Sequence, residues 1–75
     1  GSAFVVLASE KAVKQHQLPI LAKIVDIQWA ALDPVVMGLG PVYAMTPILQ
    51  RHKLGLKDIH HIEINEAFAA QVLAC

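Results

Sequence analysis

Three apolar runs, each followed by a helix-like pattern, constrain the fold of this chain most. The runs span residues 3–8, 20–30 and 59–64. The first is continuously apolar, as expected of a strand that is covered on both faces. Alternation of strand and helix with short connections is typical of parallel strands joined by right-handed crossovers. The sequence therefore predicts an α/β fold in the order β-α-β-α-β-α, with a mostly parallel sheet.

The second run also shows which of its faces should be covered. In a strand, successive side chains point to opposite faces, so residues two apart share a face. One face of the run 20–30 is mostly apolar and is interrupted by Lys23; its apolar residues are Leu21, Val25, Ile27 and Trp29. We expect this face to pack against the rest of the fold, with its far end exposed.

Helix signals occur between and after the runs. Ser9 is a typical N-cap, and Glu10 follows in the first turn, where the helix dipole favours a negative charge. A second helix is predicted from Pro41 to about Lys53, because proline fits the first turn and apolar residues recur at helical spacing, with His52 on the same face. Thr46-Pro47 predicts either a kink or a restart within it. Gly55 is a candidate stop signal.

Composition narrows the classes of function. The chain has 75 residues, is 56% apolar and has no net charge. A neutral chain offers no electrostatic case for nucleic acid or for an anionic membrane, and the apolar runs are too short to cross a bilayer. A single cysteine, Cys75, excludes an internal disulfide and indicates a reducing compartment. Because so short a chain buries little surface, this composition predicts either a subunit with large interfaces or part of a larger fold.

The strand-to-helix junction at Asn65-Glu66 is the first candidate site. Asn65 is well placed as an N-cap for a third helix, and Glu66 suits the positive end of its dipole. The functional alternative is that Asn65 follows the carboxyl end of a parallel strand, where open α/β sheets bind ligands. Its amide could then hold a water molecule or stabilise an oxyanion.

The loop from Met37 to Pro41 is the second candidate, and the histidines and the cysteine are weaker ones. Its glycines allow close backbone approach, but Gly-x-Gly alone is weak evidence of phosphate binding. Adjacent His60 and His61 would point to opposite faces of a strand and cannot chelate one ion together, so no metal site is predicted. Cys75 lies about ten residues into the third predicted helix, where a buried, inert thiol is expected.

These two loops together resemble a known family. The stretch "NEAFAAQVLAC" is similar to the Asn-Glu-Ala-Phe motif of the thiolases, which are coenzyme-A-dependent acyltransferases. The stretch "DPVVMGLGPVYA" resembles the thiolase segment before that motif, with Met37 placed 28 residues before Asn65. The opening "GSAFVVLASEKA" is similar to a strand and helix of the same family, although it lacks the usual aspartate and has Phe4 in place of alanine.

The resemblance implies a fold, a reaction and roles for particular residues. Residues 1–75 would be the first three βα units of the C-terminal half of a thiolase. The whole enzyme would cleave 3-ketoacyl-CoA to acetyl-CoA and a shortened acyl-CoA, as in fatty acid β-oxidation, or catalyse the reverse condensation. Coenzyme A would be a substrate, with no further cofactor. Asn65 would hold a water molecule of the oxyanion hole, and the acyl pocket would be lined by Met37, Ala67 and Phe68.

The resemblance also implies what this chain does not supply. The family's nucleophilic cysteine precedes this region, whereas its Gly-His-Pro histidine and its second cysteine follow it. We therefore expect the 75-residue chain to be inactive alone and do not assign the nucleophile to Cys75. Expected partners are acyl-CoA, coenzyme A and the remainder of a thiolase chain, in a homo-oligomer. The bacterial cytoplasm is the expected location, with mitochondria or peroxisomes as alternatives. A non-catalytic acyl-CoA- or lipid-binding module and an oligomerisation module remain open.

Overall fold

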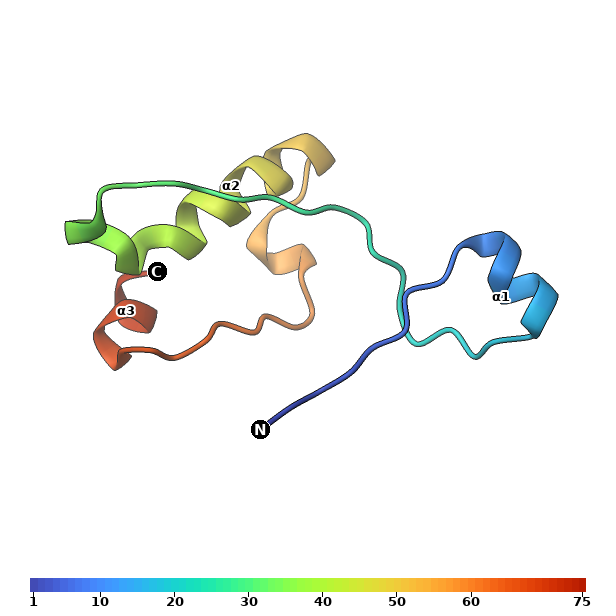
Figure 1. The fold of residues 1–75 in the computed structure, drawn as a ribbon. Coiled ribbons are helices and arrows are strands. Elements are labelled where there is room, and N and C mark those ends of the chain that lie inside the picture. Colours follow the sequence, from blue (N-terminus) through green and yellow to red (C-terminus); the bar gives the residue numbers. More distant parts are fainter.

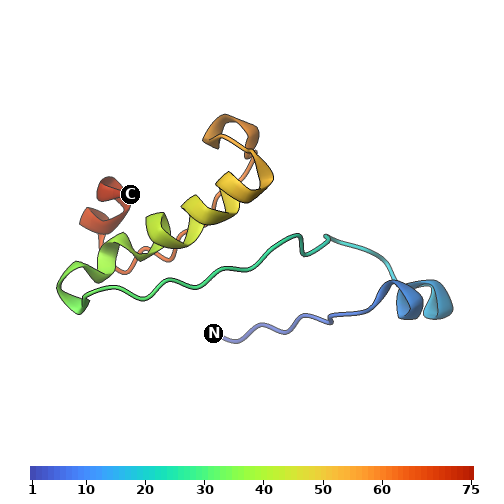
Figure 2. The same cartoon turned by 90° about the horizontal axis from the view of Figure 1, so that it is seen from above.

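The computed structural model describes residues 1–75 and contains only helices and extended segments. Figure 1 shows one longer helix with shorter ones at both ends of the chain. The α-helices are α1 (Glu10–His16), α2 (Gly40–His52) and α3 (Ala69–Ala74), and the 3₁₀ helices are η1 (Pro34–Leu39) and η2 (Leu56–Asp58). In both views α1 lies apart from α2 and α3 (Figures 1 and 2).

The prediction of an α/β fold with a parallel sheet is wrong for this chain. The runs 3–8, 20–30 and 59–64 are extended, but none of them is a strand. Outside the helices, every backbone hydrogen bond joins residues at most five positions apart; the two longest run from the Leu18 amide to the Val13 carbonyl and from the Leu54 amide to the Leu49 carbonyl. A strand requires a ladder of bonds to a neighbour. The apolar pattern identified extended segments, whereas a sheet also requires a neighbouring segment at pairing distance.

The chain also lacks a core. No residue is fully buried, and the accessible surface is 7106 Å². A compact globular protein of 8.1 kDa exposes about 4,500 Å² by the usual scaling with mass. The difference of roughly 2,600 Å² on one chain would correspond to about 5,200 Å² counted over two partners, the upper part of the range for permanent interfaces. Large apolar side chains such as Phe4 (96%) and Leu73 (89%) are therefore exposed in the chain by itself.

Residues 18–33 are here called the strap; its later part runs alongside α2, and its earlier part leads away toward α1 (Figures 1 and 2). Three alternating residues of the strap, Asp26, Gln28 and Leu32, are half-buried. A Cβ atom on Gly40 would lie 3.9 Å from Leu32 Cδ2, so the strap meets the first turn of α2. The face predicted to be covered is instead exposed, with Leu21 98% and Trp29 84% accessible. The reason is that successive side chains of an extended segment point to opposite faces, and here the face with the polar side chains is the one that contacts α2.

The helix signals were partly correct. Ser9 caps α1 as predicted, with its Oγ accepting from the Ala12 amide at 3.2 Å. Pro41 lies in the first turn of α2, also as predicted, and the helix continues through Pro47 without a restart. The end of α2 comes before Gly55, because Lys53 adopts a left-handed conformation with a φ of 54° and its amide donates to two carbonyls of the last turn.

The third helix begins later than predicted. Its N-cap is Phe68, not Asn65, and no side chain caps it. The Asn65 carbonyl instead accepts a hydrogen bond from the Ala67 amide at 2.8 Å, which makes a tight turn at the end of the extended run. The cap interpretation of Asn65 is therefore wrong, since three residues separate it from the first helical residue.

Candidate functional site

An open apolar groove lies between η1 and α3, two segments that are far apart in the sequence. These elements pack against each other, and η1 also packs against α2, which follows it directly. The groove has a volume of about 310 Å³, and six of its eight lining residues are hydrophobic. From η1 the groove is lined by Val35, Val36, Gly38 and Leu39, and from the other side by Phe68, Ala70, Gln71 and Ala74. η1, which holds the start of the Met37–Pro41 loop, is thus in contact with the helix that follows the Asn65-Glu66 junction.

The residues predicted for the site are not all in the groove. Phe68 lines it, and its side chain is 62% exposed. Met37 lies on η1 between two lining residues, but it is 56% exposed and does not line the groove. Asn65 and Ala67 are exposed and precede the groove-lining part of the segment. Glu66 lines a different hollow of about 380 Å³, on another face of α3.

Gln71 is a groove residue that sequence reasoning missed. Its Oε1 is shielded from solvent and has no hydrogen-bond partner. A Cβ atom on Gly38 would lie 3.6 Å from Gln71 Cγ, which is ordinary van der Waals contact, so the glutamine stem covers this glycine. The signal was present in the sequence, because Gln71 follows Phe68 by three residues and so shares its side of a helix.

Cys75 also contacts η1. Its Sγ donates to the Gly38 carbonyl across 3.4 Å. The prediction of a buried thiol is wrong, since Cys75 is free and exposed. The reason is that the helix is short and has no further layer packed over its last turn. Gly38 is therefore the point where η1 meets both Gln71 and Cys75.

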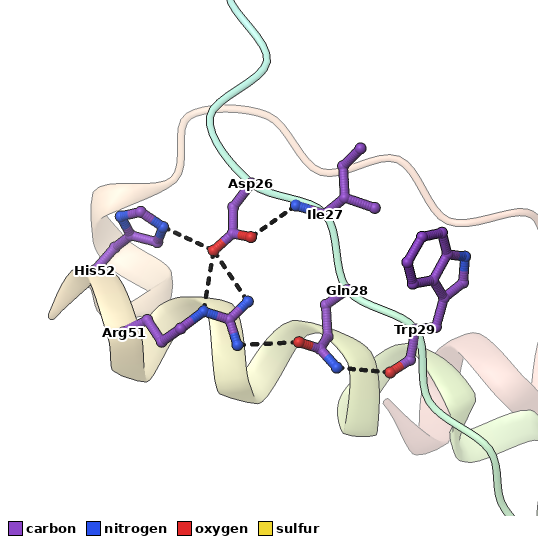
Figure 3. Close-up of polar contacts among 6 residues, drawn as sticks. All are labelled: Asp26, Ile27, Gln28, Trp29, Arg51 and His52. Carbon is purple, nitrogen blue, oxygen red and sulfur yellow. Dashed lines mark hydrogen bonds and ion pairs between the residues drawn. The ribbon is translucent and has the colours of Figure 1, made fainter.

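A polar cluster, here called the clasp, joins the strap to the last turn of α2 (Figure 3). It consists of Asp26, Gln28, Arg51 and His52. Asp26 Oδ2 accepts from Arg51 Nε at 3.1 Å and Nη2 at 3.0 Å, and lies 2.8 Å from His52 Nε2. Arg51 Nη1 donates to Gln28 Oε1 at 3.0 Å. The guanidinium is planar and carries five N–H donors, and three of them donate hydrogen bonds to side chains of the strap.

The clasp favours the charged form of its carboxylate. The hydrogen bond from His52, and next that from Arg51, lower the pKa of Asp26 from its ordinary value of 3.8. The Ile27 amide, which donates to Asp26 Oδ1 at 2.7 Å, acts in the same direction. Sequence analysis placed His52 on the apolar face of the helix and did not single out Asp26. No periodicity could have paired these residues, because 26 positions separate them.

The other titratable groups do not assemble into a further site. His61 contacts Glu63 two residues away, and both side chains are largely exposed. No group of three or more His, Cys, Asp or Glu side chains converges on a position where a metal ion could be held. None of the helices has the length and apolar composition that crossing a membrane requires.

Comparison with known proteins identifies the family. Residues 18–75 match the family model of the thiolase C-terminal domain. The chain belongs to the thiolase family. This match includes both loops of the groove, from η1 to the last residue of the chain. The resemblance inferred from the Asn-Glu-Ala-Phe and Met-Gly-Leu-Gly-Pro stretches is confirmed.

Named thiolases match nearly the whole chain. The rat mitochondrial 3-ketoacyl-CoA thiolase is 47% identical over 74 residues, which are 99% of this chain and 19% of that protein. The peroxisomal 3-ketoacyl-CoA thiolase of Saccharomyces cerevisiae is 44% identical over all of this chain and 18% of its own length. The β-ketoadipyl-CoA thiolase of Pseudomonas knackmussii is 49% identical over 99% of this chain and 18% of its own length. This thiolase-family chain thus spans about a fifth of the length of these relatives. No solved structure matches it.

Proposed function

We propose that this chain forms the oxyanion and acyl-binding side of a thiolase that cleaves 3-ketoacyl-CoA with coenzyme A. The contact between η1 and α3 carries this proposal, because it joins the Met-Gly-Leu-Gly-Pro loop to the end of the Asn-Glu-Ala-Phe segment. In the proposed role, Asn65 holds the water molecule that stabilises the thioester oxyanion. Phe68 lines the groove proposed for the acyl chain, Met37 and Ala67 lie next to lining residues and contact the acyl chain at its edge, and Glu66 has a structural or hydrogen-bonding role.

The chemistry of the reaction explains why an amide suits this position. A thiolate attacks the thioester, a base takes an α-proton, and negative charge develops on the carbonyl oxygen. An uncharged amide can orient a water molecule toward that oxygen without changing the charge beside the thiolate. The exposed position of Asn65 leaves its side chain free for such a contact. The thiolate and the base belong to other parts of the enzyme.

The apolar groove supports an acyl chain as the group bound. Hydrophobic residues dominate its lining, and Gln71 and Gly38 are the exceptions. Burying a methylene group of the substrate against such a surface contributes about 0.8 kcal/mol. Coenzyme A acts as a substrate in this proposal, and no additional cofactor takes part. The complete enzyme is proposed to be a homo-oligomer, with the bacterial cytoplasm as its location.

A graft tests this function. Residues 1–75 replace the matching segment of the rat mitochondrial 3-ketoacyl-CoA thiolase, and thiolysis of acetoacetyl-CoA is measured. We expect the graft to be active and Asn65→Ala to lower kcat about 100-fold, the loss typical of an oxyanion-hole donor. Gln15→Ala, which removes an exposed amide on α1, is the matched control and should leave kcat unchanged.

Two results would contradict the proposal. One is a graft that folds and assembles but does not cleave the substrate, which would favour a non-catalytic acyl-CoA-binding or oligomerisation role. The other is an Asn65→Ala graft with the kcat of its parent. The purified 75-residue chain should not cleave acetoacetyl-CoA, and cleavage by it would show that the nucleophile lies within these residues.

A further inference from the structure

We propose that Asp26 and Arg51, assisted by His52, are positioning residues that fix the strap along α2 and thereby hold η1 against α3. The inference concerns the shape of the groove, so it does not depend on which molecule the groove binds. Neither residue lines the groove. Their effect is transmitted through the strap, which connects the clasp to η1.

The strap is anchored to α2 at two points. At one end the clasp binds the last turn of the helix, with three hydrogen bonds from Arg51 and one contact from His52. At the other end Leu32 approaches the first residue of the helix, Gly40. Figure 3 shows the side chains of Asp26 and Gln28 turned toward the helix from the passing strap. Between these points, the strap and the helix lie side by side in opposite chain directions and are connected at both ends.

The lengths of the two segments match closely. The six residue-to-residue steps from Asp26 to Leu32 span about 20 Å at 3.3 Å per extended residue. The eleven steps from Gly40 to Arg51 span about 17 Å at 1.5 Å per helical residue. The strap is therefore almost fully extended between its anchors and has little slack. A slip of the clasp by one helical turn, about 5.4 Å, would pull Leu32 away from the start of α2.

The end of the strap leads directly into the groove. Leu32 is followed by Asp33, whose Oδ1 caps η1 by accepting from the Val35 amide at 2.9 Å. The helix η1 then contacts α3 through Gly38, which meets Gln71 and the Cys75 thiol. A displaced strap moves the cap of η1, and η1 is only six residues long. The clasp thus controls a contact that neither of its charged groups touches.

Within the clasp, the positive charge beside Asp26 is the guanidinium of Arg51. Arg51 and His52 contact the same carboxylate oxygen, while Gln28 binds the remaining guanidinium N–H group. Replacing the carboxylate with an amide removes the charge but keeps the size of the side chain. Asp26→Asn therefore loosens the clasp without creating a cavity. Asp26→Glu retains the charge on a longer stem and should restore part of the effect.

A disulfide measures the contact between η1 and α3. Gly38→Cys introduces a second thiol at the residue whose carbonyl contacts the Cys75 thiol, and its Cβ would make only ordinary contacts with Gln71. The rate of disulfide formation with oxidised glutathione is measured for the full 75-residue chain in buffer and in concentrated guanidinium chloride. We expect faster formation in buffer. Asp26→Asn or Arg51→Gln should slow it up to about fivefold, the range for a partly exposed ion pair.

A second measurement separates positioning from general destabilisation. Amide exchange of the α2 backbone should change little in Asp26→Asn, since the helix retains its own hydrogen bonds and its Lys53 cap. Asp58→Asn is the matched control, because that carboxylate binds the Gly55 amide outside the clasp. Asp26→Glu should recover part of the crosslinking rate.

Three results would overturn the inference. The first is an unchanged crosslinking rate in Asp26→Asn and Arg51→Gln. The second is an equal loss of crosslinking and of α2 protection, which would indicate a merely structural role. The third is a parent chain that crosslinks no faster in buffer than in denaturant, which would show that η1 and α3 are not held together.

Discussion

The helix α1 is expected to depend on local side-chain contacts, above all on the cap from Ser9. It has seven residues and lies apart from α2 and α3 in both views of the structure (Figures 1 and 2). Isolated helices this short are marginal, because nucleation fixes several residues for the first hydrogen bond. Local interactions must therefore supply the stabilisation that packing normally gives.

The magnitude follows from two side-chain contacts of α1. Ser9 Oγ accepts from the Ala12 amide, and its loss in Ser9→Ala costs about 1 kcal/mol. This corresponds to a fivefold fall in the ratio of helix to coil. The ion pair between Glu10 and Lys14, 2.7 Å long and four residues apart, adds about 0.4 kcal/mol. Glu10→Gln should therefore lower the same ratio about twofold.

Nuclear magnetic resonance can measure this ratio without a folded core. Cα chemical shifts over Glu10–His16 report helix population, and the Ala12 amide exchange rate reports the cap. Ser2→Ala is the matched control, since Ser2 is exposed and precedes the helix. Equal shifts in Ser9→Ala and the parent chain would refute the reasoning. Coil shifts in the parent chain would refute it as well.

Three further changes have expected outcomes. Gln71→Leu removes a shielded oxygen that has no hydrogen-bond partner and should stabilise the packing of α3 against η1 by about 1 kcal/mol. Slower amide exchange in α3 would show this, with Gln50→Leu, a change at an exposed residue, as the control. Gly38→Ala should slow the same exchange, by about 0.5 kcal/mol, because no left-handed φ is required there and the new methyl group meets no clash; faster exchange would contradict this. The pKa of Asp26 is lowered from 3.8, so its contribution to the stability of the folded chain is fully present above about that pH and is lost as pH falls through the lowered pKa. The ¹³C shift of the Asp26 carboxyl group should therefore titrate below 3.8. A titration midpoint above 3.8 would contradict the clasp.

Local chemistry was the part of this structure that could be predicted. Ser9 and Pro41 identified helix starts because capping and the missing proline amide act within one turn. The family was also accessible, since the spacing from Met37 to Asn65 joins two specific motifs. The elements at which these two motifs lie, η1 and α3, pack against each other in the structure.

The remaining features depend on groups that no short pattern connects. The strap shows this clearly, because alternation identified its two faces but not which of them meets α2. The exposed apolar face was predicted to be covered, yet the long-range bonds of Asp26 and Gln28 turn the polar face toward the helix. Similarly, an extended run becomes a strand only when it is hydrogen-bonded to a partner, and no backbone hydrogen bond joins 3–8, 20–30 or 59–64 to another extended segment.

The orientation of the strap gives the chain a built-in fluorescence reporter. Trp29 is the sole tryptophan, and its indole is on the outward face, 84% exposed. Water around the ring should therefore give the free chain a long-wavelength emission that iodide quenches readily. Any molecule that covers Leu21, Val25 and Ile27 must also approach this indole. A blue shift with protection from iodide would thus record binding to that face, without a label and at concentrations well below those needed for nuclear magnetic resonance.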